Sequence, residues 1–312
     1  MILHFLGTSS GAPTSKRNVS GLGLWFIQRG KWWLFDCGEG TQHQIMRSPL
    51  KLSQLEKIFI THLHGDHLYG LIGLLASRSL RGGAPDEVQL FGPPGIDKYV
   101  DSIMRVSPVH LQYPLTIRVI AEGQVYEDDE MIVSCVPVEH RVPAFAYSVV
   151  EKEKPGAFQV ELAKAKGIPS GPLYGQLKRG EAIQLPDGRV FQPDEFLGPV
   201  QKGRKIVISG DTGPSGALKQ LAREADVLVH EATYAHPHLD LAERSGHSTA
   251  LQAAQLALEA NVNQLLLTHI SPRYEDAEGG IGLPELLGEA QEVFPQTILA
   301  HDFLEHIVKR YR

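Results

Sequence analysis

The chain has 312 residues, of which 42% are hydrophobic and 21% are charged. This balance is typical of a soluble globular protein that buries a large core in one large domain. The formal net charge of -6 argues against a protein that coats nucleic acid through bulk positive charge, although a local basic patch could still bind it.

The first residues and the cysteines bear on the location of the protein. Residues 1–7 form too short an apolar run for a secretory signal, and no later segment approaches the roughly 20 apolar residues of a membrane helix. We therefore expect a cytoplasmic protein that makes no membrane contact. Cys37 and Cys135 each lie in an apolar run, which predicts buried, reduced thiols and excludes a disulfide framework.

Predicted strands and helices alternate along the chain. Five apolar, β-branched runs are predicted to be buried strands, at 57–60, 132–136, 205–208, 226–229 and 264–267. Segments with helical spacing of their apolar residues are predicted helices, at 68–80, 217–225, 250–260 and 283–294. This alternation predicts an α/β fold.

The stretch 151–203 interrupts that rhythm. It is rich in Gly, Pro and Lys and lacks sustained apolar periodicity, which predicts an arm inserted into a single domain, 1–312. An ordinary long loop is the alternative, but loops beyond about 12 to 15 residues are uncommon in compact domains. Cations at 152, 154, 164, 166, 178 and 179 outnumber the glutamates at 151, 153 and 161, so we expect a basic arm, with a solvated linker as the alternative.

Four potential metal ligands follow the strand predicted at 57–60. They are His62, His64, Asp66 and His67, with Gly65 between them to allow a tight turn. Imidazole and carboxylate groups suit zinc, and α/β proteins place ligands where strands leave the sheet. Four such groups in so short a span cannot all converge on one tetrahedral ion and leave room for other ligands. Two ions that share the loop are the simpler prediction.

Three later strand-like runs also end at a potential ligand. These are His140, Asp211 and His269. Any one of them alone would be read as a turn or helix-capping residue. Together with the clustered run, they predict that several strand ends meet at one shared edge and one shared site.

This pattern resembles the metallo-β-lactamase superfamily, in which His-x-His-x-Asp-His is followed by a distant His, Asp and His. The resemblance spans nearly the whole chain and implies a four-layer αβ/βα sandwich. It also implies the ligands of two zinc ions. One ion would be held by His62, His64 and His140, the other by Asp66, His67 and His269, and Asp211 would bridge both.

Further segments are similar to the ribonuclease Z family, endonucleases that remove the 3′ trailer from precursor tRNA. The similar segments are Phe5 to Thr8, Pro13 to Asn18, His230 to Thr233, His247 to Thr249, and 171–180 in the arm. The lysine in the second segment lies one place later than in the family pattern. The chain length fits the short form of the family, which implies a homodimer that acts on precursor tRNA.

The resemblance also assigns roles to single residues. Arg17 and Asn18 would position RNA phosphates, although a solvated basic turn is the ordinary reading of that loop. Gly171, Pro172, Lys178 and Arg179 would belong to a tRNA-binding surface of the arm.

Three further residues are expected to take part in the chemistry. Asp66 would help to accept a proton, and His247 would donate one to the leaving oxygen while Glu231 orients it. Ser248 and Thr249 could simply cap the helix that follows, but capping does not explain His247. His230 is expected to be a buried structural histidine.

Asp36 is expected to orient a zinc-binding histidine, with a turn-forming role before Gly38 as its alternative. Two other functions remain open. A small-molecule hydrolase could use the same fold and ligands. A non-catalytic protein with structural zinc ranks last, because structural sites are usually closed and rich in cysteine.

Overall fold

Two seven-stranded mixed sheets form the centre of the structure, a computed structural model that describes residues 1–80, 85–277 and 280–310. The first sheet contains, in spatial order, β16 (Glu305–Ile307), β1 (Ile2–Gly7), β2 (Gly21–Phe26), β3 (Lys31–Phe35), β4 (Leu55–Phe59), β5 (Val88–Gly92) and β6 (Leu115–Val119). The second contains β15 (Thr297–Leu299), β14 (Leu265–Thr268), β13 (Val227–Glu231), β12 (Lys205–Ile208), β9 (Ala144–Glu151), β8 (Met131–Val138) and β7 (Gly123–Glu127).

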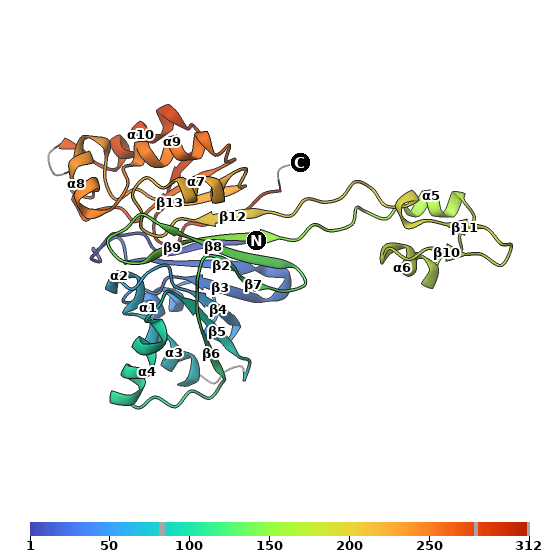
Figure 1. The fold of residues 1–312 in the computed structure, drawn as a ribbon, viewed down its shortest axis with the longest axis horizontal. Helices are drawn as coiled ribbons and strands as arrows, with labels where there is room; N and C mark the ends of the chain where they lie inside the picture. The colour runs from blue at the N-terminus through green and yellow to red at the C-terminus, as the bar shows by residue number, and fades with distance from the viewer. Residues whose placement is uncertain (81–84, 278–279, 311–312) are drawn as a thin grey trace.

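Helices cover the outer face of each sheet (Figure 1). On the first sheet they are α1 (Thr41–Met46), α2 (Gly65–Leu68), α3 (Leu71–Leu80) and α4 (Ile96–Val106). On the second they are α7 (Gly216–Ala222), α8 (Leu239–Ser245), α9 (Ala250–Glu259) and α10 (Leu283–Val293). The predicted four-layer αβ/βα sandwich is therefore confirmed.

Three apolar cores hold these layers together. The central core joins the inner faces of the two sheets, with Phe35 and Phe59 from the first sheet against Tyr147 and Val229 from the second. One outer core packs α3 and α4 on the first sheet, and the other packs α7, α9 and α10 on the second. Strand β8 alternates buried and half-buried residues along most of its length, as expected for a strand with one face against the core.

The five predicted strands are β4, β8, β12, β13 and β14, and the predicted helices are α3, α7, α9 and α10. Several boundaries differ by one to three residues, and the segment 68–80 is not a single helix. The short helix α2 ends before Tyr69, and α3 begins at Leu71. Between them Gly70 packs so tightly that a Cβ there would lie 2.0 Å from the carbonyl oxygen of Gly38. The break at Gly70 separates the short helix α2, which carries Asp66 and His67, from the longer helix α3.

The segment 151–203 is an arm that projects away from the sandwich (Figure 1). Its head contains α5 (Val160–Ala165), α6 (Pro172–Lys178) and a hairpin of β10 (Ile183–Gln184) and β11 (Val190–Phe191). The head has an apolar core of its own, which includes Leu177 and Phe196. Sequence analysis did not anticipate this core, because its residues come from short elements without sustained periodicity.

Both cysteines are free and buried, as predicted. Within the described residues, no helix combines the length and the apolar character needed to cross a membrane.

Candidate metal centre and active site

The ends of several strands place the predicted ligands together. Strands β8, β12, β13 and β14 all run in the same direction in the second sheet, so the residues that follow them meet at one edge. The loop 62–67 follows β4 of the first sheet instead. The expected shared edge is therefore made by two sheets, and the site lies where their edges meet.

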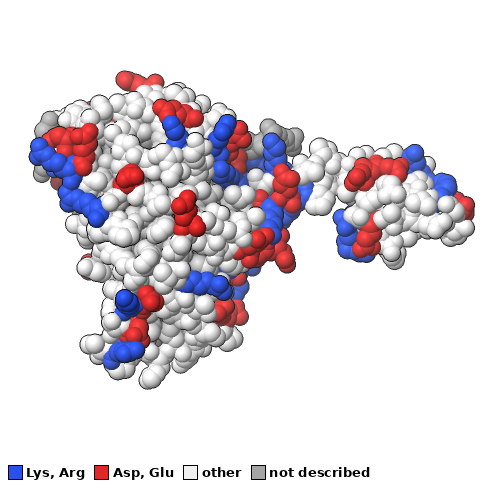
Figure 2. Space-filling view, in the orientation of Figure 1, with Lys and Arg blue, Asp and Glu red and all other residues white. Residues whose placement is uncertain are grey.

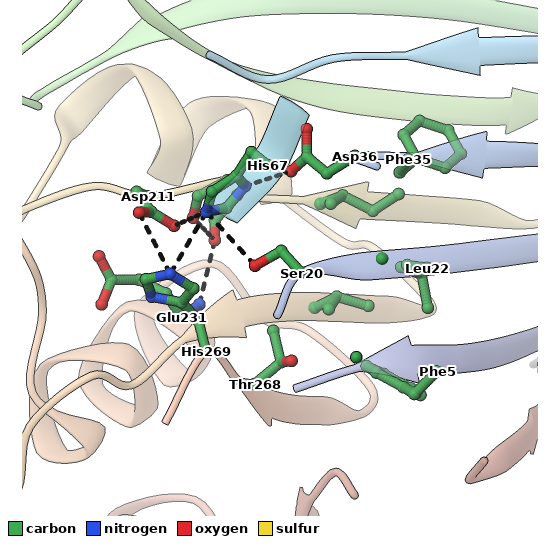
Figure 3. Close-up of a pocket in the computed structure, with 16 residues that line it drawn as sticks. Phe5, Ser20, Leu22, Phe35, Asp36, His67, Asp211, Glu231, Thr268 and His269 are labelled. Atoms are coloured by element: carbon green, nitrogen blue, oxygen red, sulfur yellow. Dashed lines mark hydrogen bonds and ion pairs between the residues drawn. The ribbon is translucent and has the colours of Figure 1, made fainter. Parts of the chain in front are cut away.

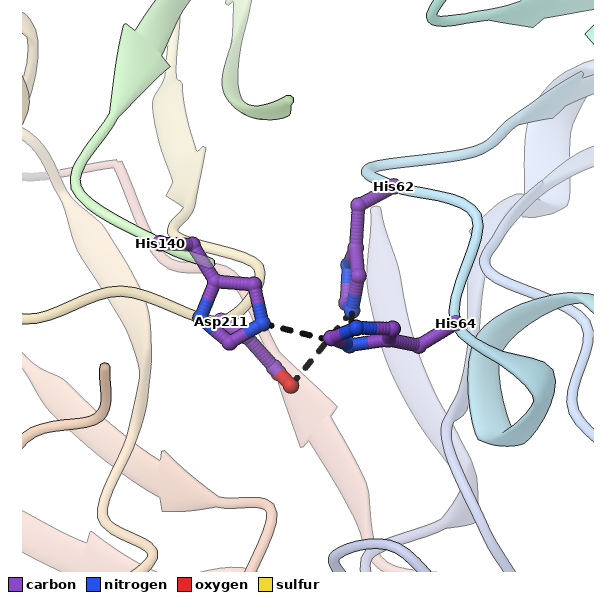
Figure 4. Close-up of side chains that lie close together, drawn as sticks. All are labelled: His62, His64, His140 and Asp211. Atoms are coloured by element: carbon purple, nitrogen blue, oxygen red, sulfur yellow. Dashed lines mark hydrogen bonds and ion pairs between the residues drawn. The ribbon is translucent and has the colours of Figure 1, made fainter. Parts of the chain in front are cut away.

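The first ligand group contains His62, His64, His140 and Asp211 (Figure 4). The Nδ1 of His64 lies 3.0 Å from the Nε2 of His62 and 3.2 Å from the Nε2 of His140. The Asp211 Oδ2 lies 3.6 Å from the same nitrogen of His62. Three imidazole nitrogens and one carboxylate oxygen therefore point at a common centre.

The second group contains Asp66, His67, Asp211 and His269. Figure 3 shows His67 directed toward Asp211 and His269, with Asp36 on its other side. The His67 Nε2 lies 3.3 Å from the His269 Nε2 and 3.2 Å from the Asp211 Oδ1. The Asp66 Oδ2 lies 3.2 Å from the His269 Nε2. Asp211 thus belongs to both groups, as the resemblance implies.

These residues fit divalent metal ions. Neighbouring donor atoms lie 3.0 to 3.6 Å apart, and ligands on a tetrahedral zinc with bonds of about 2.0–2.1 Å would lie about 3.3 Å apart. The Asp211 Oδ1 is buried without a hydrogen-bond partner, which is costly unless a cation meets it. Burial would raise the pKa of Asp66, but its hydrogen bond with His269 and the charge of His67 hold it well below its usual range. An ionised Asp66 is suited to bind a cation.

Other groups fix the rings of the histidines. The Nδ1 of His67 donates to Asp36 at 2.7 Å, and the Nδ1 of His140 donates to the carbonyl of Gly246 at 2.7 Å. Hydroxyl groups lie beside two further histidines. The Thr61 hydroxyl is 3.0 Å from the Nδ1 of His62, and the Thr233 hydroxyl is 2.9 Å from the Nδ1 of His269. Such partners orient a histidine so that its second nitrogen faces the metal.

These roles of Thr61 and Thr233 were not among the predictions from the sequence. Both residues lie inside motifs that it identified, Thr61 immediately before His62 and Thr233 two residues after Glu231. A hydroxyl residue next to a ligand motif was the sequence feature that could have indicated an orienting partner. The carbonyl that accepts the hydrogen bond from His140 belongs to the main chain of Gly246, so no side chain could have indicated it.

His247 and Glu231 form a pair at the edge of both ligand groups. The His247 Nδ1 lies 2.7 Å from the Glu231 Oε1, and the His247 ring centre lies 5.1 Å from that of His140 and 5.4 Å from that of His269. Burial lowers the pKa of His247, but the Glu231 carboxylate outweighs it and raises the pKa to about 9. A histidine held in this way can carry a proton near neutral pH.

Glu231 is itself fixed by three other donors. Its carboxylate accepts hydrogen bonds from the main-chain N–H of Thr212 at 2.9 Å and of Thr233 at 3.1 Å, and from the Thr233 hydroxyl at 2.7 Å. His230 is buried next to it, and its Nδ1 lies 2.7 Å from the Glu231 carbonyl oxygen. This environment is the structural one expected for His230.

Arg17 requires a correction. Its side chain is buried, and its Nη1 donates to the Thr8 hydroxyl and to the carbonyl of Ala300, both at 2.7 Å. Its Nε lies 3.5 Å from Glu275. The buried Nη1 and Nε thus make contacts that hold the loop against the sandwich, and this arrangement does not agree with the expected RNA-phosphate contact.

Asn18 also has a structural position. Its side-chain Nδ2 donates to the carbonyl of Glu39 at 2.9 Å, and its main-chain N–H donates to Asp302 at 2.7 Å. Both donors are therefore engaged within the protein, and Asn18 fixes the turn at Glu39 instead of standing free for a phosphate.

The arm is not basic, which corrects a second expectation. Residues 151–203 contain eight Lys and Arg and seven Asp and Glu, because acidic residues after Glu161 offset the early lysines. Figure 2 shows both signs of charge on the head. Arg179 pairs with Glu181 at 2.8 Å, and Lys178 lies 5.4 Å from the ring centre of Phe158. Gly171 and Pro172 are exposed at the start of α6.

Comparison with known proteins identifies the family. The chain is 65% identical to Ribonuclease Z of Brevibacillus brevis over 312 residues, which covers 100% of this chain and 98% of the relative. It is 51% identical to Ribonuclease Z of Nostoc punctiforme over 312 residues, with 100% and 97% covered. The family model described as Anti-Pycsar protein Apyc1 matches residues 1–150.

Solved structures agree with this identification. The crystal structure of the human short form of tRNase Z matches with a TM-score of 0.72 and 30% identity, covering 99% of this chain and 100% of that one. The metallo-β-lactamase fold protein YhfI of Bacillus subtilis matches with a TM-score of 0.69 and 98% of both chains covered; at 15% identity this likeness shows the fold alone. The chain therefore belongs to the ribonuclease Z family, endoribonucleases built on the metallo-β-lactamase fold.

Proposed function

We propose that this chain is a zinc-dependent endoribonuclease that cleaves the 3′ trailer from precursor tRNA. The observation that carries the proposal is the position of the His247–Glu231 pair beside two metal-ligand groups that share Asp211. The site thus combines groups that can bind cations with a group that can donate a proton. Metal-assisted phosphodiester hydrolysis uses both. The relatives named Ribonuclease Z support RNA as the substrate.

Two zinc ions per subunit are part of the proposal. His62, His64 and His140 would hold one, Asp66, His67 and His269 would hold the other, and Asp211 would bridge them. Metal ions bound in this way supply a water of lowered pKa and positive charge that stabilises a phosphate under attack. Asp66, kept ionised by His269 and His67, would also accept a proton from the attacking water.

His247 would complete the reaction. Because Glu231 keeps it protonated, it can donate a proton to the departing 3′ oxygen of the tRNA. The products would be a tRNA with a 3′-hydroxyl and a trailer with a 5′-phosphate. This assignment requires that His247 lies on the tRNA side of the scissile phosphate.

The arm 151–203 is proposed to bind the body of the tRNA, as an extension of the single catalytic domain 1–312. Contacts would come from the exposed start of α6 at Gly171 and Pro172 and from its end at Lys178 and Arg179. Since the head is nearly neutral, these contacts would depend on shape and main-chain groups as well as on charge. We further propose a homodimer that acts in the cytoplasm.

A cleavage assay tests the proposal directly. Wild-type protein should convert a precursor tRNA into tRNA and trailer, and His64→Ala should lose that activity while it keeps its fold and loses bound metal. His43→Ala is the matched control, because His43 is exposed on α1 outside both ligand groups. Cleavage that survives in His64→Ala, or in protein stripped of metal, would contradict the proposal.

A small-molecule phosphodiesterase on the same fold is the competing function. The two are separated by a variant that lacks 155–200 and joins Lys154 to Gln201 with a short linker. Those ends already form a paired bridge, with main-chain hydrogen bonds of 3.0 and 2.9 Å. Deletion should abolish precursor-tRNA cleavage and spare hydrolysis of a simple nitrophenyl phosphodiester. If wild-type protein cleaves only the simple ester, the competing function is correct.

A further inference from the structure

A pocket of about 480 Å³ opens beside the metal-ligand groups, on the side of His64 and Asp66. Its other walls are the loop 11–13, Glu39 and Tyr69. This volume lies in the range of roughly 300 to 1,000 Å³ that is usual for small-ligand sites. The pocket is therefore large enough for a group that is attached to the phosphate at the metal centre.

Tyr69 gives this pocket an aromatic wall. The residue is 67% exposed, and among the large hydrophobic side chains exposed in the described part of the chain it is the only aromatic one. Aromatic rings usually bury most of their surface, so an exposed ring beside a catalytic site indicates a contact with a ligand.

The Tyr69 ring packs against the backbone of the ligand loop, 62–67. The main-chain N–H of Tyr69 donates to the carbonyl of Gly65 at 2.8 Å. A Cβ on Gly65 would lie 2.2 Å from the Tyr69 ring, so the ring lies directly against the Gly65 backbone. Gly65 belongs to the ligand loop, and the ring is thereby fixed relative to His64 and Asp66.

The opposite walls are fixed as well. The N–H of Gly11 donates to the Asp66 Oδ2 at 2.8 Å, which ties the loop 11–13 to a metal ligand. Asn18 holds the turn at Glu39 through a hydrogen bond of 2.9 Å to its carbonyl. The pocket is therefore largely formed before a ligand enters, which reduces the entropy lost on binding.

The composition of the walls favours a nucleobase over a second phosphate. Glu39 lines the pocket and its negative charge would repel an anion, whereas a base can stack on an aromatic ring whatever its identity. His247 lies beside His140 and His269, and it is absent from the residues that line this pocket. If His247 protonates the tRNA oxygen, this pocket lies toward the other product.

We propose that the pocket binds the first nucleotide of the trailer and that its base stacks on Tyr69. This inference rests on the proposed function, because it takes the RNA strand and its polarity from that reaction. Tyr69 is then a substrate-binding residue, and its stacking stabilises the bound substrate and the transition state equally. Its loss should therefore raise KM and leave kcat almost unchanged.

The test compares two precursor tRNAs, one intact and one with an abasic ribose at the first trailer position. With the wild-type enzyme, the abasic RNA should show a kcat/KM about tenfold lower, the effect expected of one lost base stack. Tyr69→Ala should show the same loss on the intact RNA and no further loss on the abasic RNA. Tyr69→Phe keeps the ring and should behave like wild type. Leu258→Ala, at another exposed apolar residue, is the matched control.

Three results would overturn the inference. Equal cleavage of intact RNA by wild type and Tyr69→Ala would show that the ring makes no contact. Independent, additive losses from the abasic ribose and from Tyr69→Ala would show that the two do not touch. A change in oligomeric state of Tyr69→Ala, with equal loss on both RNAs, would assign the ring to a contact between copies of the chain. Failure of wild type to cleave the intact RNA would instead refute the proposed function.

Discussion

The Asp36 carboxylate accepts a hydrogen bond from the His67 Nδ1 at 2.7 Å, although the two residues are 31 positions apart. The same carboxylate accepts the main-chain N–H of Thr61 at 2.8 Å and the Thr61 hydroxyl at 2.9 Å. Asp36 adopts a left-handed backbone conformation with φ of 57°, which Asp and Asn tolerate better than most residues. One side chain thus fixes both the start of the loop 62–67 and the ring of the candidate ligand His67.

We expect Asp36→Asn to weaken metal binding. An amide has one acceptor oxygen where the carboxylate has two, so either His67 or Thr61 loses its partner. Metal affinity should fall about 10- to 100-fold, as is usual when the partner of a ligand histidine is removed. Competition with a chromogenic chelator measures this. Asp226→Asn is the control, because Asp226 is buried and accepts the main-chain N–H of Lys205, outside both ligand groups. Equal affinities in both variants would argue against the orienting role.

We expect His247→Ala to slow precursor-tRNA cleavage by about 100- to 10,000-fold, the usual contribution of a positioned acid. KM should change little. The same variant should lose much less activity on a bis-nitrophenyl phosphodiester, because nitrophenolate leaves without being protonated. His236→Ala is the control, since His236 belongs to neither ligand group. Parallel losses on both substrates would show that His247 has a role other than proton donation.

The metal-free protein should lose stability as the pH rises. Burial lowers the pKa of both His67 and His247, but Asp211 and Asp36 hold the first well above its usual range, and Glu231 raises the second to about 9. Histidine in the unfolded chain titrates near about 6.5. The folded state therefore binds these protons more tightly. The stability that His247 contributes is complete below pH of about 6.5 and is lost as pH rises through about 9, and the contribution of His67 is lost as pH rises through its own raised pKa.

Urea unfolding of chelator-treated protein across that pH range measures the effect. His247→Gln should flatten the dependence near pH 9, and bound metal should remove the part due to His67 because the metal replaces its proton. An unchanged slope in His247→Gln would contradict the prediction.

Arg17→Ala should destabilise the fold instead of weakening RNA binding. The substitution removes two buried hydrogen bonds of a charged group, to Thr8 and to Ala300, and the ion pair with Glu275. We expect a loss of about 3 kcal/mol in the free energy of unfolding. Lys16→Ala, at the exposed neighbouring position, should change it little. A stable Arg17→Ala variant with a raised KM for precursor tRNA would restore the original RNA-binding interpretation.

Glu151→Gln should loosen the root of the arm. The buried Glu151 carboxylate ends β9 and pairs with Arg204 at 2.8 Å, where the chain returns from the arm, and with Arg310 at 2.6 Å. Loss of this charge should cost about 2 kcal/mol of stability. It should also raise KM for precursor tRNA while activity on a nitrophenyl phosphodiester is retained. Glu161→Gln, in an exposed pair with Lys164, should be neutral.

The sequence by itself indicated an α/β fold and the candidate ligand residues, and the resemblance to the metallo-β-lactamase superfamily supplied the four-layer arrangement and the two ligand sets. Local spacing decided the former, because a strand-forming run delivers the residues that follow it to a sheet edge whatever the rest of the chain does. His62, His140, Asp211 and His269 each follow a strand-like run of their own and only together predicted a shared site, and the structure brings their side chains together.

Only the tertiary structure decided what each charged residue meets. Arg17 has the sequence of an exposed basic turn, yet partners up to 283 residues away bury its guanidinium. Lys152 and Lys154 pair with Glu127 and Glu130 of a distant hairpin, so the cations at the base of the arm are not free. Such pairings depend on how the two sheets, the arm and the terminal segments pack against one another, and no short-range pattern in the sequence records that packing.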